Sequence, residues 1–224
     1  MIVALDDPDL RAAEALARQL EGAVAAFKIG LTLFSAVGPH ALDRIGRFGN
    51  VFCDLKFHDI PHQVELASAE IARRGVWMFT IHASGGPSMV QAAVAGAARA
   101  EAPSPLIAAV TVLTALSAVE LDQVGQGGEI QPQVARLAGM ASQAGATAIV
   151  CSALHLKKVR EIVGDKVVLV TPGIRGVKDG AGDQVQTASP AQACADGADF
   201  IVVGRPITEA LDPASAAEEI SQQF

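Results

Sequence analysis

Three charged side chains, those of Asp54, Lys56 and Asp59, fall within the six residues Asp54-Leu55-Lys56-Phe57-His58-Asp59. The apolar residues that precede Asp54 indicate that this segment ends a buried strand, and alternation along a strand places Asp54 and Lys56 on the same face. Charged groups on a buried face lose several kcal/mol unless they pair with each other or bind a ligand. The segment is therefore either a structural ion pair or a catalytic cluster, and the rest of the chain must decide between the two.

Further charged and polar residues follow other apolar segments. If these segments are strands, their carboxyl ends together carry Asp6, Lys28, Asp54, Lys56, Asp59, His82, Thr114, Pro172, Arg175, Gly204 and Arg205. This set is heavily charged for a chain in which only 18% of the residues are charged. Instead of acting in a site, Lys28 could be a lysine at a strand end whose ammonium group reaches solvent. For His82, the pattern favours a hydrogen-bonded structural histidine over a functional one.

Eight short apolar runs predict strands, namely Ile2–Leu5, Ala25–Ile29, Val51–Phe57, Met78–His82, Leu106–Leu113, Ala148–Cys151, Val167–Val170 and Phe200–Val203. Helical spacing predicts helices over Arg11–Leu20, Ser35–Ile45, Val64–Ala72, Pro87–Ala100, Gln133–Ala144, Ser152–Val163, Pro190–Asp196 and Pro213–Gln222. Strands that alternate with helices indicate an α/β protein with a parallel sheet. Eight such units in 224 residues fit a (β/α)8 TIM barrel that forms a single domain over residues 1–224. An open doubly wound sheet is the alternative, but no Gly-x-Gly-x-x-Gly follows the first strand, which disfavours a dinucleotide-binding version.

The end of the chain has features of a phosphate site. In a TIM barrel the active site lies at the carboxyl ends of the strands, and the loops after the last two strands commonly hold a phosphate. Gly204 lets an anion approach backbone N–H groups, and Arg205 offers a bidentate fork. The loop 175–189, which includes Gln184, is long for a compact barrel and is expected to act as a lid or a binding loop; residues 125–132 form a second expected loop.

Composition limits the partners of this chain. The formal net charge is −7 and no basic stripe occurs, which argues against nucleic acid. No apolar run reaches the roughly 18 residues that a membrane helix needs. The N-terminus begins as a strand without a secretory signal, and Cys53, Cys151 and Cys194 are expected to be buried thiols of a cytoplasmic protein, neither disulfides nor metal ligands.

The charged and glycine-containing motifs at the predicted strand ends together resemble those of the orotidine 5′-monophosphate decarboxylase family. The resemblance covers essentially the whole chain and is most specific at residues 54–61, Asp-Leu-Lys-Phe-His-Asp-Ile-Pro. The other matching segments, in order, are Val-Ala-Leu-Asp at 3–6, Lys-Ile-Gly at 28–30, His-Ala-Ser-Gly-Gly at 82–86, Val-Thr-Val-Leu-Thr at 110–114, Thr-Pro-Gly-Ile-Arg at 171–175, Gly-Asp-Gln at 182–184 and Gly-Arg-Pro-Ile-Thr at 204–208. No catalytic position departs from the family pattern.

The resemblance implies a carboxy-lyase that converts orotidine 5′-monophosphate into uridine 5′-monophosphate and CO₂, the last step of de novo pyrimidine nucleotide synthesis, without a cofactor or a metal. It also implies a homodimer in which Asp59 and Ile60 enter the partner's active site. By position, it assigns the charge array to Lys28, Asp54, Lys56 and Asp59. The other implied contacts are Asp6 and the partner's Asp59 at the ribose, Thr114 beside the pyrimidine, and Pro172, Gln184, Gly204 and Arg205 at the phosphate.

The chemistry of the side chains agrees with this assignment. Loss of CO₂ leaves a carbanion at C6 of the pyrimidine, with no neighbouring π system to delocalise the charge. A fixed ammonium such as Lys56 stabilises charge that develops only in the transition state and can then protonate C6. Asp54 would lie near the substrate carboxylate, a like-charge contact that is relieved as CO₂ departs, and two neighbouring lysines should keep it ionised.

Two other functions compete with this one. The first is an Mg²⁺-dependent decarboxylase or aldolase of sugar phosphates, resembling 3-keto-L-gulonate 6-phosphate decarboxylase. That group also has Asp-x-Lys-x-x-Asp on its third strand, but it tends to carry an acidic residue in place of Lys28, and a lysine there repels a metal ion. The second is a non-catalytic barrel that binds a phosphate ligand, against which the intact set of Asp54, Lys56 and Asp59 argues.

Overall fold

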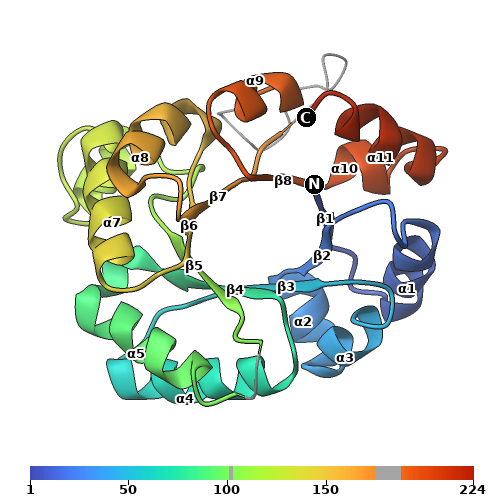
Figure 1. Ribbon diagram of the computed structural model, residues 1–224, viewed down its shortest axis with the longest axis horizontal. Coiled ribbons are helices and arrows are strands. Elements are labelled where there is room, and N and C mark those ends of the chain that lie inside the picture. Colours follow the sequence, from blue (N-terminus) through green and yellow to red (C-terminus); the bar gives the residue numbers. More distant parts are fainter. Residues whose placement is uncertain (101–102, 175–187) are drawn as a thin grey trace.

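The computed structural model describes residues 1–100, 103–174 and 188–224 of the chain. Within these residues, parallel strands β1 to β8 follow one another in sequence order around a closed barrel, with β8 paired to β1 (Figure 1). The strands are β1 Ile2–Leu5, β2 Ala26–Ile29, β3 Val51–Phe57, β4 Met78–His82, β5 Leu106–Val110, β6 Ala148–Val150, β7 Val168–Thr171 and β8 Phe200–Val203. This confirms the predicted (β/α)8 barrel, and an open sheet is wrong for this chain.

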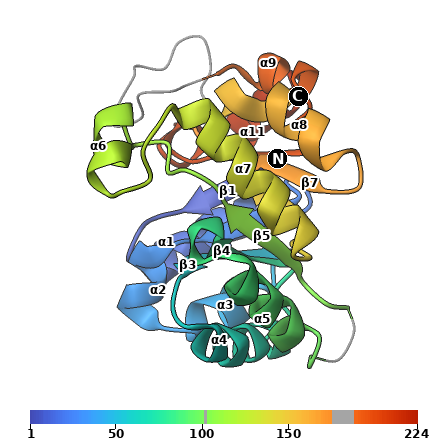
Figure 2. The same cartoon turned by 90° about the vertical axis from the view of Figure 1, so that its left-hand side faces the viewer.

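Helices form a layer outside the ring of strands (Figures 1 and 2). They are α1 Leu10–Gln19, α2 Leu31–Val37, α3 His40–Ile45, α4 Pro61–Arg73, α5 Pro87–Ala97, α6 Ala118–Gln123, α7 Ile130–Gln143, α8 Leu156–Val163, α9 Pro190–Ala195, α10 Arg205–Thr208 and α11 Pro213–Ser221. Each predicted helical segment contains a helix, except that the prediction of a single helix over Ser35–Ile45 is wrong, because α2 and α3 divide that segment. Gly38, with φ 68°, and Pro39 separate α2 from α3, because proline cannot donate to the preceding turn.

Two short helices were not predicted. Helix α6 begins with a capping box, in which the Ser117 hydroxyl accepts from the Glu120 N–H and the Glu120 side chain accepts from the Ser117 N–H. Figure 2 shows α6 standing out from the layer of helices. Helix α10 begins at Arg205 directly after β8, with Pro206 in its first turn. Both helices lie in connections that follow strands, at the end of the barrel where the candidate site is expected.

The core has two layers. The larger layer lies between the strands and the helices and contains Cys53, with Leu55 and Phe57 packed against it. A smaller apolar cluster, which includes Ile2, Phe52, Met78 and Val202, fills the inside of the barrel. Residues of β3 therefore alternate between the two layers, which confirms that Cys53, Leu55 and Phe57 face away from the barrel interior.

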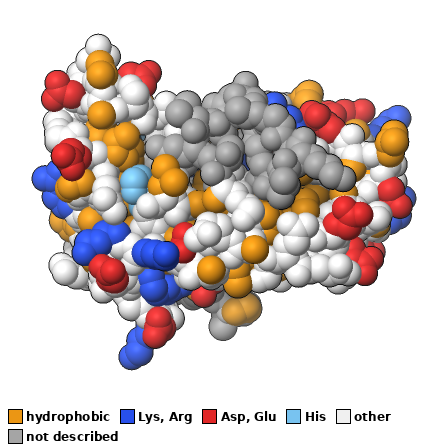
Figure 3. Space-filling model, turned by 90° about the horizontal axis from the view of Figure 1, so that it is seen from above, with side chains coloured by type: hydrophobic (Ala, Val, Ile, Leu, Met, Phe, Trp, Pro, Cys, Tyr) orange, Lys and Arg blue, Asp and Glu red, His pale blue; other side chains and the backbone are white. Residues whose placement is uncertain are grey.

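The surface differs from the expectations in one respect. Cys53 and Cys151 are buried free thiols as predicted, but Cys194 is exposed. Its neighbour Ala193 is the buried residue of that turn of α9. Among the described residues, no helix has the length and apolarity to cross a membrane. On the face in Figure 3, basic and acidic side chains are interspersed, and the described residues drawn there form no continuous basic surface.

Candidate active site

A cavity of about 920 Å³ opens at the carboxyl ends of the strands. Its lining includes eight of the residues predicted for the site, namely Asp6, Lys28, Asp54, Lys56, Thr114, Pro172, Gly204 and Arg205. These residues come from the ends of β1, β2, β3, β5, β7 and β8 or from the connections that follow them. The barrel closure therefore brings together side chains that are as far apart as Asp6 and Arg205 in the sequence.

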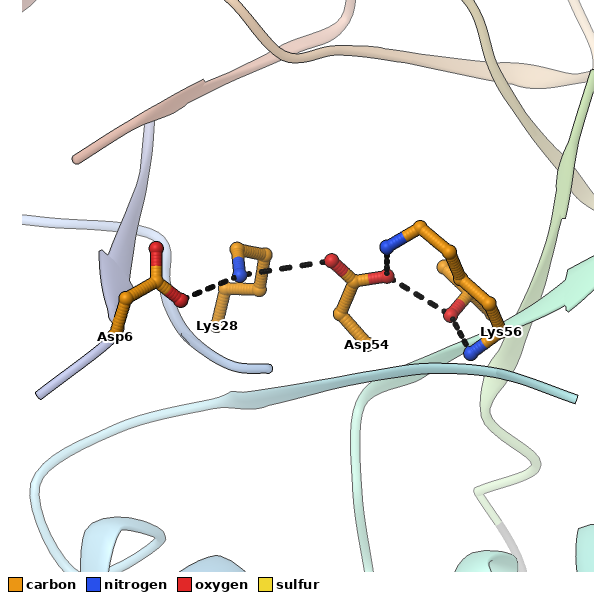
Figure 4. Close-up of polar contacts among 5 residues, drawn as sticks. Asp6, Lys28, Asp54 and Lys56 are labelled. Atoms are coloured by element: carbon orange, nitrogen blue, oxygen red, sulfur yellow. Dashed lines mark hydrogen bonds and ion pairs between the residues drawn. The ribbon is translucent and has the colours of Figure 1, made fainter. Parts of the chain in front are cut away.

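Four charged side chains form a row in which carboxylates and ammonium groups alternate (Figure 4). Lys28 Nζ lies 3.1 Å from Asp6 Oδ1 and 3.5 Å from Asp54 Oδ2. Lys56 Nζ lies 2.8 Å from Asp54 Oδ1. The order is thus Asp6, Lys28, Asp54, Lys56, and the row has no net formal charge. We define these four residues as the charge row.

Strands β1 to β3 set the spacing of the charge row. Lys28 is paired with Ala4 of β1 and Phe52 of β3 in the parallel register, so its side chain lies between the ends of those strands. Gly30 leaves room for the pair that Lys28 forms with Asp6: a Cβ at Gly30 would lie 3.0 Å from Lys28 Nζ and 3.1 Å from Asp6 Oδ1. A side chain at position 30 would therefore press on this ion pair.

Thr80 of β4 makes hydrogen bonds to two residues of the charge row, and the sequence patterns did not predict it as a site residue. The Thr80 hydroxyl donates to Asp54 Oδ1 at 3.0 Å and accepts from the Lys56 backbone N–H at 2.8 Å. Thr80 is buried. The sequence does contain one indication of this role: Thr80 is a polar residue inside the apolar run Met78–His82, and a buried hydroxyl needs a hydrogen-bond partner.

The electrostatic environment keeps Asp54 ionised. Burial is the largest influence and by itself would raise the pKa of Asp54. The ammonium groups of Lys28 and Lys56 and the hydrogen bonds from Lys56 and Thr80 outweigh burial, so the pKa of this carboxyl lies below its ordinary value. Asp54 is thus a carboxylate at neutral pH, as the sequence predicted.

Strands β5 to β8 contribute mainly apolar or neutral side chains to the cavity, while Arg205 and Glu209 add charged groups after β8. The apolar or neutral residues include Val110, Val150, Val170, Val202 and Cys151. Burial raises the pKa of the Cys151 thiol to about 12, so this group is neutral at physiological pH. Sequence reasoning identified Cys151 only as a buried thiol, since nothing local to it indicates that its strand end faces a cavity.

Asp59 and Ile60 do not line this chain's cavity. Both are exposed, in the connection between β3 and α4, and the Ile60 N–H donates to Asp59 Oδ1 at 2.7 Å. Ile60 is 63% exposed, as are several other large apolar side chains among the described residues. Their predicted contribution to a partner's site stays a prediction, while Gln184 and Arg175 lie outside the described residues.

Two histidines lie beside Lys56. The rings of His58 and His82 are 5.3 Å apart between centroids. Burial, followed by the nearby charges of His58 and Lys56, lowers the pKa of His82. His82 is therefore held neutral next to the charge row, although it is not among the residues that line the cavity.

The charge row can bind an anion and deliver a proton. In the described part of the chain, no group of three or more His, Cys, Asp or Glu side chains has the arrangement to hold a metal ion. A fixed ammonium in a cavity with an apolar wall stabilises negative charge that develops on a bound molecule. The arrangement therefore fits a reaction that forms and protonates a carbanion.

Comparison with known proteins identifies the family. A model described as the orotidine 5′-phosphate decarboxylase / HUMPS family matches residues 1–220. The orotidine 5′-phosphate decarboxylase of an Anaeromyxobacter species is 48% identical over 219 residues, 97% of this chain and 95% of the relative. That of Moorella thermoacetica is 45% identical over 230 residues, 100% of this chain and 91% of the relative. The crystal structure of orotidine 5′-phosphate decarboxylase from Lactobacillus acidophilus matches with a TM-score of 0.87 and 35% identity, covering 100% of this chain and 98% of that one. The chain therefore belongs to the orotidine 5′-phosphate decarboxylase / HUMPS family.

Proposed function

We propose that this protein is a carboxy-lyase that converts orotidine 5′-monophosphate into uridine 5′-monophosphate and CO₂, the last step of de novo pyrimidine nucleotide synthesis. The observation that carries the proposal is the Lys56 ammonium, hydrogen-bonded to the Asp54 carboxylate, which is only 13% exposed, inside a cavity at the carboxyl end of the barrel. The full-length similarity to orotidine 5′-phosphate decarboxylases supports the choice of substrate.

In the proposed reaction, the bond between C6 and the carboxylate carbon breaks, and its electron pair remains on C6. Lys56 stabilises this carbanion because its charge is already fixed by Asp54 and needs no reorganisation. Lys56 then donates a proton to C6. Asp54, which is ionised and only 13% exposed, would face the substrate carboxylate, and departure of CO₂ relieves that repulsion. No step of this reaction requires a metal or an organic cofactor.

The remaining site residues have binding roles in this proposal. Asp6 would accept hydrogen bonds from the ribose, and Thr114 would lie beside the pyrimidine. Gly204 and Arg205 would bind the phosphate, with Pro172 next to them; these three residues line the same cavity as the charge row. A charge-assisted contact with Arg205 is the main expected source of phosphate affinity.

We further propose that the active enzyme is a homodimer. Two observations support this: Asp59 lies only three residues after Lys56 but outside the cavity of its own chain, and Ile60 exposes most of its apolar side chain. In a dimer with two-fold symmetry, each chain would insert these residues into the partner's site. Asp59 would then reach a ribose hydroxyl of the neighbouring substrate.

The position of Lys28 argues against a sugar-phosphate enzyme that needs Mg²⁺. Lys28 Nζ lies within 3.5 Å of both Asp6 and Asp54, so these carboxylates already have a cation between them. A divalent ion at the same carboxylates would be repelled by the ammonium group.

The direct test is the fall in absorbance of orotidine 5′-monophosphate when purified protein is added in the presence of EDTA. We expect turnover at an unchanged rate after chelation. Binding of the nucleotide without turnover would instead support a non-catalytic barrel, and activity that depends on added Mg²⁺ would support the sugar-phosphate class.

A further inference from the structure

Strand β3 is irregular where it carries the charge row. Its parallel register with β4 pairs Cys53 with Phe79 and then Phe57 with Ile81. Three residues of β3, Asp54 to Lys56, therefore lie opposite the single residue Thr80. A bulge of this kind removes regular ladder hydrogen bonds and redirects side chains, and such bulges are common next to active sites.

The backbone of Lys56 has an unfavourable conformation. Its φ is +53°, and among the described residues it is the one non-glycine residue with positive φ. An L-residue in this left-handed region costs roughly 1–2 kcal/mol, so the surrounding structure must hold it there. The Lys56 N–H donates to the side-chain hydroxyl of Thr80 in β4.

The same hydroxyl also fixes Asp54. Thr80 Oγ1 accepts from the Lys56 N–H at 2.8 Å and donates to Asp54 Oδ1 at 3.0 Å. Asp54 Oδ1 in turn accepts from Lys56 Nζ. The hydroxyl, the carboxylate and both nitrogens of Lys56 thus form a closed circuit of hydrogen bonds. Because Thr80 is buried, water does not replace it readily.

We propose that Thr80 is a positioning residue of the active site: its hydroxyl holds Lys56 in its left-handed backbone conformation and aligns Asp54 with the Lys56 ammonium. Valine would have nearly the same shape but could neither accept from the Lys56 N–H nor donate to Asp54. The bulge would then relax, and the ammonium would no longer be fixed in the direction that the charge row requires. The inference rests on the proposed function only for its kinetic consequence.

The kinetic test compares Thr80→Val with Thr80→Ser, which retains the hydroxyl. Thr80→Val should lower kcat for orotidine 5′-monophosphate by roughly tenfold to a hundredfold, the loss expected for an unpaired buried donor. KM should change little, because Thr80 is not among the residues that line the cavity. Thr80→Ser should lower kcat by no more than about threefold, a much smaller loss than the one expected for a missing buried hydrogen bond.

A second measurement does not depend on turnover. The carboxyl carbon of Asp54, labelled with ¹³C and assigned with Asp54→Asn, reports the ionisation of that group as the pH is lowered. Thr80→Val should raise the pKa of Asp54, because the hydroxyl hydrogen bond stabilises the ionised form. If the wild-type protein does not decarboxylate the substrate, the proposed function fails, yet this titration still tests Thr80.

Thr147→Val is a matched control. The Thr147 hydroxyl also accepts from a strand N–H, that of Ile107, at 2.9 Å, but it precedes β6 at the other end of the barrel. Its loss should leave kcat and the Asp54 titration unchanged. If Thr80→Val does not fold, Thr80→Cys replaces it, because cysteine approximates serine in shape with a much weaker donor and acceptor.

Two results would overturn the inference. One is a kcat of Thr80→Val, or of Thr80→Cys compared with Thr80→Ser, that is no lower than that of the Thr147→Val control. The other is an Asp54 titration that does not respond to loss of the Thr80 hydroxyl.

Discussion

The left-handed backbone of Lys56 predicts an unusual order of stability among its variants. Lys56→Ala and Lys56→Gly both remove the ammonium group, and both keep the N–H that Thr80 accepts from. Within a strand, a variant with glycine normally has a free energy of unfolding roughly 0.5–1 kcal/mol lower than the variant with alanine. At φ +53° the order should invert, because only glycine occupies this region without strain.

The size of the inversion follows from two opposing terms. The strain on alanine is roughly 1–2 kcal/mol, and the conformational entropy lost by glycine offsets about half of it. Lys56→Gly should therefore be more stable than Lys56→Ala by about 0.5–1 kcal/mol. For a domain of this size that corresponds to a difference in Tm of about 1–4 °C.

Urea unfolding followed by circular dichroism would measure this difference. The matched control is Leu55, the preceding residue of β3, which does not have positive φ. There Leu55→Ala should be more stable than Leu55→Gly. If alanine is also the more stable residue at position 56, the described bulge is wrong, and the inference about Thr80 loses its basis.

The same two variants test catalysis. Loss of the ammonium removes both the electrostatic stabilisation and the proton donor, and one such electrostatic donor alone is typically worth about 10²–10³ in rate. We expect kcat/KM to fall by several orders of magnitude in Lys56→Ala and Lys56→Gly alike. Retention of more than about a tenth of the activity in either variant would contradict this role for Lys56.

Four further predictions concern the metal, the dimer, the phosphate and pH. EDTA should leave activity unchanged, and a loss that Mg²⁺ restores would contradict the proposed reaction. Mixed Asp59→Ala and Lys56→Ala chains should recover activity, because one site of a mixed dimer receives both defects and the other receives neither; no recovery despite proven subunit exchange would show that each chain builds its own site. Arg205→Ala should greatly lower kcat/KM for orotidine 5′-monophosphate but barely alter the slow reaction of the nucleoside orotidine, so equal losses would place Arg205 away from the phosphate. The pKa of Asp54 in the folded protein lies below its ordinary value of 3.8, so the stability that its ionisation contributes is complete above pH 3.8 and is lost on acidification. The difference in unfolding free energy between wild type and Asp54→Asn should therefore shrink below pH 3.8. A difference that stays constant with pH would contradict the lowered pKa.

Local patterns in the sequence were sufficient for the barrel and for eight of the residues that line the cavity. Apolar runs bounded by helical segments identified every strand, because strands buried on both faces are nearly continuous in apolar residues. The division of Ser35–Ile45 at Gly38-Pro39 and the capping box that begins α6 were also readable from sequence, since both are local signals.

The bulge in β3 was not readable from local patterns. Alternation correctly placed Asp54 and Lys56 toward the barrel interior, but it gives no reason for a positive φ at a lysine. That conformation depends on the register between β3 and β4 and on a hydroxyl 24 residues further along the chain. The exposure of Cys194 likewise depends on how α9 packs against the barrel, since an Ala-rich segment has no strong apolar face to set its orientation.

The two walls of the cavity explain how a row with no net charge can act on a substrate. Strands β1 to β3 supply the charge row, while β5 to β8 supply small apolar side chains such as Val110, Val150 and Val202; the charged Arg205 follows β8 in α10. A substrate that fills the cavity would displace water from this apolar wall, and electrostatic interactions are stronger where the effective dielectric constant is low. Each charge in the row is balanced by its neighbours, so the protein tolerates it without a bound ligand. In the proposed reaction, a ligand charge that appears beside Lys56 has no such balancing neighbour except the ammonium itself. The stabilisation is therefore largest for the charge that forms in the transition state, which is the condition for catalysis.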